Sequence, residues 1–201
     1  NGLSEQGVID STSDMYRPGD LVNRAEMAKF AFMVSGLPLE TAAEAPYKDV
    51  AMGQWYTDYV YTLTKNGIVS GDKLNGVPTG YFRPSDALNR AEAAKMLVNS
   101  AQMAEDLSGA PHFPDVTTSD WFYNYVETLF NNGVVAGYPD GYFRPANNIN
   151  RAEVAKMVYL SMNPVVAGFT LDSAAAASAT KVELIFSTNV DSTSAEVVAN
   201  Y

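Results

Sequence analysis

The chain has no cysteine and a single histidine, His112, among its 201 residues. Without thiols it can have no disulfide, no thiolate zinc site and no cysteine nucleophile. One imidazole cannot build a metal site with several histidine ligands, and no residues around His112 suggest a Ser-His-Asp triad. We therefore expect no catalytic residues, no metal site and no cofactor, and we expect His112 to be a surface loop residue.

Basic charge and long apolar runs are also scarce. Lysine and arginine number 13 against 23 acidic residues, which gives a net charge of −10 and a pI near 4.4. A large basic face for nucleic acid or anionic lipid is therefore not expected. No apolar run approaches the roughly 20 residues that cross a bilayer, so membrane insertion is not expected either. The apolar content of 47% is that of a globular chain.

Both ends of the chain look cut. The sequence begins at Asn1 without a signal peptide and stops at Tyr201 inside an apparent strand-and-turn pattern. We expect a fragment of a longer protein, in which the lack of a targeting segment says nothing about location.

An internal repeat organises most of the sequence. The run Tyr-Phe-Arg-Pro occupies positions 81–84 and 142–145, with a looser copy at 15–18. Five residues after each proline the run Asn-Arg-Ala-Glu begins, and a lysine always follows the glutamate by three positions (Lys29, Lys95 and Lys156). The arginines of this run are 66 and then 61 residues apart. The sequence therefore contains three repeats, of which the first is incomplete.

A second block precedes two of these runs. Positions 49–71 and 115–137 match at 11 of 23 positions without a gap. Trp121, Tyr125 and Leu129 fall at i, i+4 and i+8, which predicts an amphipathic helix ended by Asn132-Gly133. Trp55 and Trp121 head these apolar stripes, so core packing is the favoured interpretation, and a sugar-stacking face is the alternative.

The Asn-Arg-Ala-Glu run predicts the start of a second helix in each repeat. Its asparagines are good N-caps, and its glutamates lie three positions on, where a capping box places them (Asn23, Asn89 and Asn150; Glu26, Glu92 and Glu153). Each repeat is thus helix, turn-rich loop, helix. The alanines that follow favour close approach, so we expect the three capped helices to pack around a shared axis.

The arginine at each helix start is the main chemical signal. Arg24, Arg90 and Arg151 stand at the first helical position, where the helix dipole disfavours a cation by about 0.3–1 kcal/mol. One explanation is an anion site made of N–H groups and guanidinium forks. The other is structural: each arginine bonds carbonyls of a neighbouring unit, or pairs with Asp49 or Asp115 at the interface. The residues alone leave both explanations open.

The last 37 residues differ in character from the repeats. Val182, Leu184 and Phe186 alternate with polar residues, which predicts a half-buried strand. Residues 166–171 are its expected hairpin partner, across the small-residue stretch 172–180. We interpret this segment as the opening of an incomplete β-sandwich.

The repeat resembles the S-layer homology (SLH) domain. The resemblance is most complete over 113–157, which carries Asp-Val, Trp, Asn-Gly-Val-Val, Phe-Arg-Pro and Asn-Arg-Ala-Glu in order. It implies a mainly α fold of tandem modules in a pseudo-threefold arrangement around a central helix bundle. The expected domains are 1–36 (truncated), 47–104, 113–162, and a β domain resembling a bacterial Ig-like domain at 165–201.

The resemblance also implies a function. SLH modules anchor secreted proteins non-covalently to bacterial cell-wall glycans, often to polymers that carry pyruvate, and the helix-start arginine contacts the anionic sugar. It implies Arg24, Arg90 and Arg151 as ligand-binding residues, and we add Trp55 and Trp121. Asparagine replaces the family's usual threonine in all three units. We expect a non-catalytic extracellular anchor at the bacterial cell wall or S-layer, whose partner is a cell-wall polysaccharide or a peptidoglycan-linked polymer. The alternatives are a module that self-associates in a surface layer, or the anchor of a larger secreted enzyme.

Overall fold

The computed structural model describes residues 17–163 and the backbone of 171–178 and 181–186. The chain divides into two compact units after Pro164. The described part of the first unit holds the helices α2 (Arg24–Ser35), α3 (Thr57–Lys65), α4 (Arg90–Ser100), α5 (Tyr123–Asn131) and α6 (Arg151–Met162), and a short hairpin, β1 (Lys73–Leu74) and β2 (Val77–Pro78). The predicted mainly α fold is confirmed. Across the described ranges, no helix has both the length and the apolar character needed to cross a membrane.

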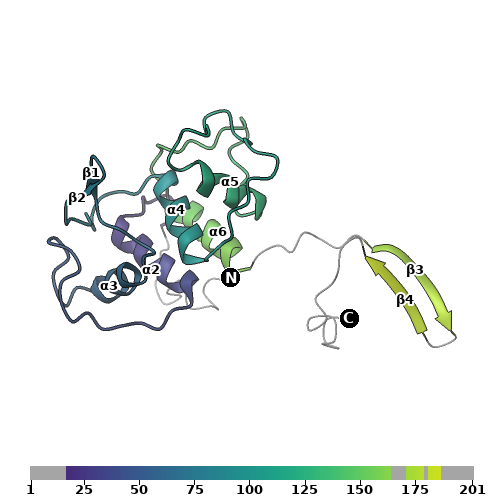
Figure 1. Cartoon of the computed structure of the whole chain (residues 1–201), viewed down its shortest axis with the longest axis horizontal. Helices are drawn as coiled ribbons and strands as arrows, with labels where there is room; N and C mark the ends of the chain where they lie inside the picture. Colours follow the sequence, from purple (N-terminus) through teal and green to yellow (C-terminus); the bar gives the residue numbers. More distant parts are fainter. Residues whose placement is uncertain (1–16, 164–170, 179–180, 187–201) are drawn as a thin grey trace. The chain divides into compact units, whose positions relative to one another are not determined.

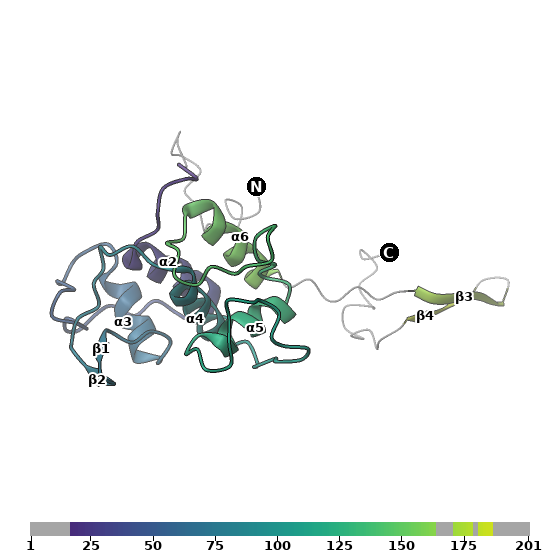
Figure 2. The ribbon, with the colours of Figure 1, turned by 90° about the horizontal axis from the view of Figure 1, so that it is seen from above.

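The capped helices α2, α4 and α6 form the centre of the first unit. Each of the three contacts the other two (Figures 1 and 2). α4 is buried on several sides, and its Ala91, Ala93 and Ala94 are at most 3% exposed. Small side chains at these positions allow the helices to approach closely, as the alanine-rich runs predicted.

The predicted capping boxes are confirmed at all three helix starts. In α6 the Asn150 side chain accepts a hydrogen bond from the Glu153 backbone N–H at 2.9 Å, and Glu153 Oε2 accepts from the Asn150 backbone N–H at 3.0 Å. The same reciprocal pair occurs at the starts of α2 and α4. Asparagine therefore fixes where each central helix begins.

We predict that Asn150→Ala lowers the free energy of unfolding by about 1 kcal/mol, because it removes the side-chain acceptor of the cap. Urea unfolding followed by circular dichroism measures the change. Asn148→Ala is the control, since Asn148 is an exposed asparagine of the same loop. Equal losses in the two variants would contradict the role given to the cap.

The first helix of each complete repeat, α3 or α5, begins after the tryptophan that was expected to head it. α5 starts at Tyr123 with Phe122 as its N-cap residue, so Trp121 precedes the helix. The buried positions include Tyr123, Val126 and Leu129, and Trp121 is 57% exposed. Trp55, at the same place before α3, is 55% exposed. The expectation that these tryptophans pack in the core is wrong, because both precede their helices and the helical period therefore does not place their side chains.

The outer helices pack on the central helix that precedes them in sequence. α3 contacts α2, and α5 contacts α4. Figure 1 shows each pair side by side. The repeats are therefore interleaved: the first helix of one repeat covers the second helix of the repeat before it.

A closed ring of backbone hydrogen bonds joins the segments that lead into the central helices. Val22 N–H donates to Ile149 O, Leu88 N–H donates to Val22 O, and Ile149 N–H donates to Leu88 O, each at 3.0 Å. All three side chains are fully buried. Each segment thus binds the other two, and the last in sequence is tied to the first.

The second unit has one described hairpin. β3 (Leu171–Ser178) pairs antiparallel with β4 (Lys181–Phe186), with Ala174 opposite Leu184. The predicted strand over 182–186 is confirmed. Its partner was expected at 166–171 but is the small-residue stretch itself, apart from Leu171, since a short connection costs less closure entropy than a long one. Residues 166–170 lie outside the described part.

Candidate functional site

The three helix-start arginines face the interfaces between repeats. Arg24 and Arg90 are only 8% and 6% exposed. Arg24 Nε donates to Phe82 O at 2.7 Å, and Arg90 Nε donates to Phe143 O at 2.8 Å. Each guanidinium also lies over the ring of the same phenylalanine, at 4.9 and 4.7 Å. Bonding to carbonyls of a neighbouring unit, one of the two explanations left open, is therefore confirmed for these two arginines.

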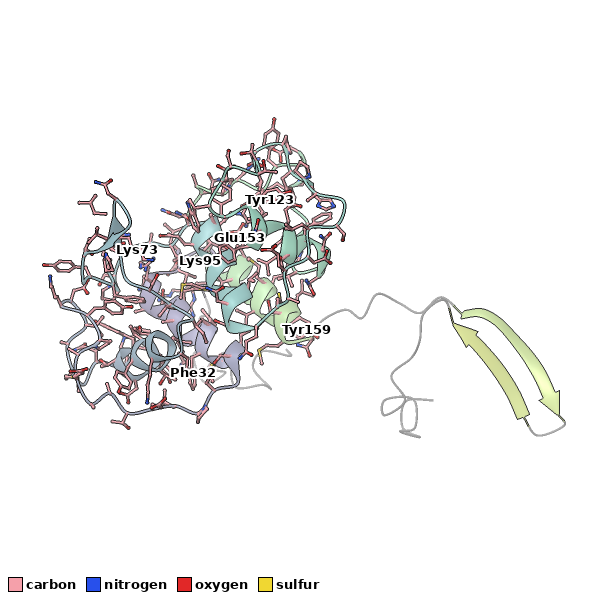
Figure 3. All side chains as sticks on the ribbon, in the orientation of Figure 1. Phe32, Lys73, Lys95, Tyr123, Glu153 and Tyr159 are labelled. Carbon is pink, nitrogen blue, oxygen red and sulfur yellow. The ribbon has the colours of Figure 1, made fainter. Side chains whose placement is uncertain are left out.

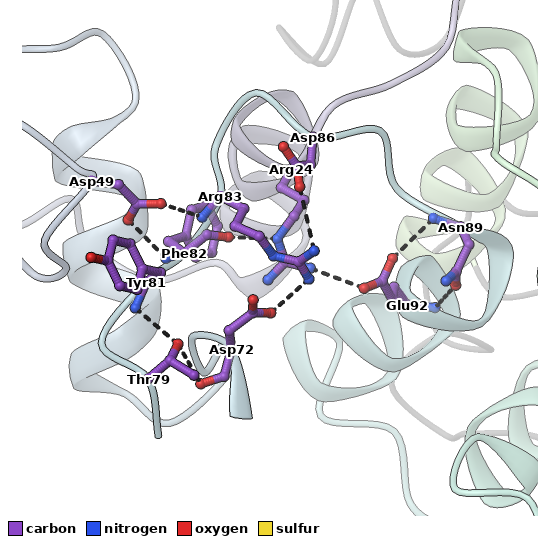
Figure 4. A network of polar contacts seen from close by, with 10 residues as sticks. All are labelled: Arg24, Asp49, Asp72, Thr79, Tyr81, Phe82, Arg83, Asp86, Asn89 and Glu92. Carbon is purple, nitrogen blue, oxygen red and sulfur yellow. Dashed lines mark hydrogen bonds and ion pairs between the residues drawn. The ribbon is translucent and has the colours of Figure 1, made fainter. Parts of the chain in front are cut away.

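The acidic partners of the arginines are the capping glutamates of the next repeat. Three ion pairs form, each between Nη1 and Oε1: Arg24–Glu92 at 3.2 Å, Arg90–Glu153 at 3.1 Å and Arg151–Glu26 at 3.0 Å. The last pair joins the third repeat to the first. Each glutamate caps its own helix with Oε2 and receives the arginine on Oε1, as Figure 4 shows for Glu92. The sequence did not predict this second use of the glutamates.

The aspartates proposed as partners act elsewhere, so that part of the expectation is wrong. Asp49 accepts hydrogen bonds from the backbone N–H groups of Phe82 and Arg83 at 2.8 and 2.7 Å (Figure 4). Asp115 receives the matching pair from Phe143 and Arg144. Each aspartate therefore holds the Phe-Arg-Pro loop of its own repeat and leaves the arginine at the helix start to the glutamate.

A groove runs beside the Arg24–Glu92 pair along α4. Its volume is about 580 Å³, and it is lined by residues of all three repeats, among them Arg24, Asp72, Lys73, Glu92, Lys95 and Trp121. Lys73 and Lys95, which are labelled in Figure 3, have no carboxylate partner within the described ranges. Two lysines without a counter-ion and one exposed indole therefore share this groove in an otherwise acidic protein.

Lys95 is the best-placed cation of this α4 groove. Its Nζ lies 5.8 Å from the Trp121 ring and 5.9 Å from the Tyr125 ring. Burial lowers the pKa of Lys95, and the nearby charges of Lys73 and Arg24 lower it further. The three cations thus repel one another across a shared space, which a bound anion would relieve.

A smaller groove occupies the same place along α6. Its volume is about 150 Å³, and it is lined by Arg90, Tyr138, Glu153 and Lys156 together with apolar residues. Tyr138 Oη donates to Glu153 Oε1 at 2.5 Å. Burial, and then this hydrogen bond, raise the pKa of Tyr138. The α6 groove therefore has the same arginine, glutamate and lysine positions as the α4 groove, with a much smaller volume.

Of the residues predicted to bind a ligand, the structure brings Arg24 and Trp121 together in the α4 groove and places Arg90 in the α6 groove. Trp55 is exposed outside both of them. The sequence did not identify Lys95 as a groove residue. The sequence pattern that could have identified it is a lysine at the same place in every repeat, three residues after a glutamate. The same spacing also fits an ion pair along one helix, so it does not by itself indicate a binding residue.

His112 is not the surface loop residue expected from the sequence. Its ring stacks on Phe130 with centroids 4.0 Å apart, and its Nδ1 lies 2.5 Å from Glu127 Oε2. Glu127 is fully buried. A buried carboxylate needs a polar partner, and His112 is drawn against α5 to provide it. This pair lies away from both grooves.

Comparison with known proteins gives a family for most of the two complete repeats. The model of the S-layer homology domain matches residues 46–94 and 112–155. An amylopullulanase of Thermoanaerobacterium thermosulfurigenes is 30% identical over 163 residues, which are 78% of this chain and 8% of that protein. An S-layer protein of Bacillus thuringiensis subsp. finitimus is 27% identical over 98% of this chain and 24% of its own length. A cellulosome-anchoring protein of Acetivibrio thermocellus is 27% identical over 74% of this chain and 33% of its own length. The chain therefore spans a third or less of each of these relatives.

Proposed function

The chain is an S-layer homology domain protein of the cell surface, and on that basis we propose that it is a non-catalytic anchor for an anionic cell-wall polysaccharide. The observation that carries the proposal is the α4 groove, where Lys95, Lys73 and Arg24 gather beside the exposed Trp121. A concave site with a few converging polar groups and an aromatic wall suits a charged sugar. Pyruvate held on such a sugar is a carboxylate of the kind that these cations would bind.

We assign the direct contact with the anion to Lys95 rather than to Arg24. Arg24 already donates to Phe82 O and Glu92, so its remaining role is to fix the glutamate and add positive charge at the wall of the groove. Lys95 has three N–H donors and no carboxylate partner in the described part of the chain. Trp121 would stack on the apolar face of the sugar. Trp55 is proposed for the same task at a neighbouring interface.

We also propose boundaries for the modules of the chain. The ring of backbone bonds and the cyclic order of the three arginine–glutamate pairs support a pseudo-threefold arrangement of modules at 1–36, 47–104 and 113–162. The β3–β4 hairpin and the division after Pro164 support a separate β domain from 165, which we propose to be the start of an Ig-like domain. The Thermoanaerobacterium amylopullulanase relative suggests that such modules can belong to a larger secreted enzyme.

Retention on cell-wall sacculi tests the proposed function. The sacculi come from a bacterium that carries one of the surface-layer relatives, and are used before and after removal of the secondary polymer with hydrofluoric acid. We expect the chain to sediment with intact sacculi and to stay in solution with stripped ones. Equal retention on both would contradict polymer binding. Sedimentation of the chain without sacculi would favour assembly into a surface layer.

We further predict that binding weakens at alkaline pH because of Lys95. A lysine is charged only below its pKa, and the pKa of Lys95 lies below the ordinary lysine range, so affinity falls as the pH rises through that lowered value. Lys95→Arg keeps its charge throughout and should bind with little pH dependence. Calorimetric titration with solubilised polymer from neutral to alkaline pH measures this. A parallel decline in wild type and Lys95→Arg would contradict the assignment.

A further inference from the structure

The α4 and α6 grooves differ in the length of one loop. Nine residues separate Gly71 from Tyr81, whereas four separate Gly137 from Tyr142. The five additional residues belong to the β1–β2 hairpin, which has no counterpart in the third repeat. Both grooves have an arginine, a capping glutamate and the lysine three positions after it, whereas Trp121 lines the α4 groove alone of the two.

The hairpin opens and extends the α4 groove. Lys73 of β1 and Gly76 of its turn line the groove, and Lys73 is exposed. Asp72, at the base of the hairpin, also lines the groove, and its Oδ1 pairs with Arg83 Nη2 at 2.6 Å (Figure 4). The side chain that could have neutralised Lys95 is thereby occupied. The hairpin thus adds the cation of Lys73 to the groove, and the aspartate at its base, Asp72, is paired with Arg83.

A tyrosine closes the α6 groove. Tyr138 follows Gly137 as Asp72 follows Gly71. Its hydroxyl donates to Glu153, and its ring lies under two guanidinium groups, 4.8 Å from Arg90 Cζ and 4.2 Å from Arg144 Cζ. The side chain therefore occupies part of the α6 groove, whose volume is about 150 Å³ against about 580 Å³ beside α4.

We propose that the two grooves are functionally unequal: the α4 groove takes the anionic glycan, the β1–β2 hairpin contributes Lys73 as a second contact for a further negative group of the same polymer, and Tyr138 closes the α6 groove to it. This inference rests on the proposed function. The chemistry it requires is an acidic polysaccharide with negative groups close enough to meet Lys95 and Lys73 together. The exposed position of Lys73 at the groove mouth suits a charge on an adjacent sugar.

Matched lysine variants of the whole chain test the inequality. Lys95 and Lys156 are equivalent in sequence, and one lines each groove. The probe is the soluble polymer released from the sacculi, titrated by calorimetry. Lys95→Ala should weaken binding about tenfold or more, because a partly buried charge contact is lost. Lys156→Ala should change affinity by less than about twofold, as expected for a charge that does not touch the ligand.

Two hairpin variants test the second contact. Lys73→Ala should weaken binding by about threefold, as for one exposed ion pair. Deletion of 73–77 leaves Asp72 joined to Pro78, as Tyr138 is joined to Pro139, and should lose at least as much affinity. Melting temperatures identify any variant that fails to fold, and Lys73→Ala remains informative if the deletion does.

The outcomes separate the two proposals. If wild-type chain does not bind the polymer at all, the proposed function is wrong. If wild type binds and the two alanine variants of Lys95 and Lys156 lose the same affinity, or neither loses any, the inequality of the grooves is overturned. If Lys95→Ala alone is affected but Lys73→Ala and the deletion bind as wild type, the role of the hairpin is overturned.

Discussion

Arg90→Ala should lower the free energy of unfolding by about 3 kcal/mol, because it breaks a buried, hydrogen-bonded ion pair. The guanidinium side chain is only 7% exposed and serves two acceptors, Phe143 O and Glu153. Removing it leaves a buried carbonyl without that donor and a half-buried carboxylate without its counter-charge. The loss falls at the junction of the second and third repeats, so we expect the whole first unit to unfold at lower urea concentration.

The size of this effect is judged against an exposed pair in the same chain. Lys65 pairs with Glu40 on the surface, with side chains 55% and 35% exposed. Lys65→Ala should cost much less than Arg90→Ala, because exposed ion pairs contribute little to stability. Arg90→Lys should remain well below wild type, because an ammonium lacks the planar fork that reaches both acceptors. If Arg90→Ala costs no more than Lys65→Ala, the arginine–glutamate pairs do not hold the repeats together.

The second large effect is expected at His112. His112→Ala should lower the free energy of unfolding by about 2–4 kcal/mol, because it leaves the fully buried Glu127 without its side-chain partner. The backbone N–H of residue 112 at 3.2 Å would then be the remaining donor from this loop. The stacking contact with Phe130 is lost as well. Urea unfolding of the single variant measures the change.

A double variant separates the unpaired polar group from the lost packing. His112→Ala combined with Glu127→Leu removes the carboxyl group that needs a partner, and replacing both members of a buried hydrogen bond by apolar groups can be nearly neutral or stabilising. We therefore expect the double variant to be more stable than His112→Ala alone. Additive losses from His112→Ala and Glu127→Leu would show that the two residues are not coupled.

Local features of the fold could be predicted from the sequence, and contacts between distant repeats could not. The capping boxes at Asn23, Asn89 and Asn150 follow from residues three positions apart, and the structure has all of them. The pairs made by the arginines join residues 68, 63 and 125 positions apart. The sequence offers several acids at every interface, so chemistry alone cannot select the glutamate over the aspartate.

The roles of Trp121 and Lys95 at the site could likewise not be predicted from the sequence. Trp121 fits the helical period of the residues after it, yet α5 begins two residues later, so that period does not place the side chain, which is 57% exposed. Lys95 lies three positions from Glu92, which suggests a pair along the helix. The glutamate is instead used by Asn89 and Arg24, which leaves the lysine to the groove. Only the packing of three repeats reveals that competition.

We propose that a few local cations hold an anionic polymer on an acidic chain. The most direct measurement is calorimetric titration of the wild-type chain with soluble wall polymer, before and after mild acid treatment that removes its pyruvate groups. We expect the polymer without pyruvate to bind at least about tenfold more weakly, because charge-assisted hydrogen bonds are lost. Equal affinity for the two preparations would contradict it.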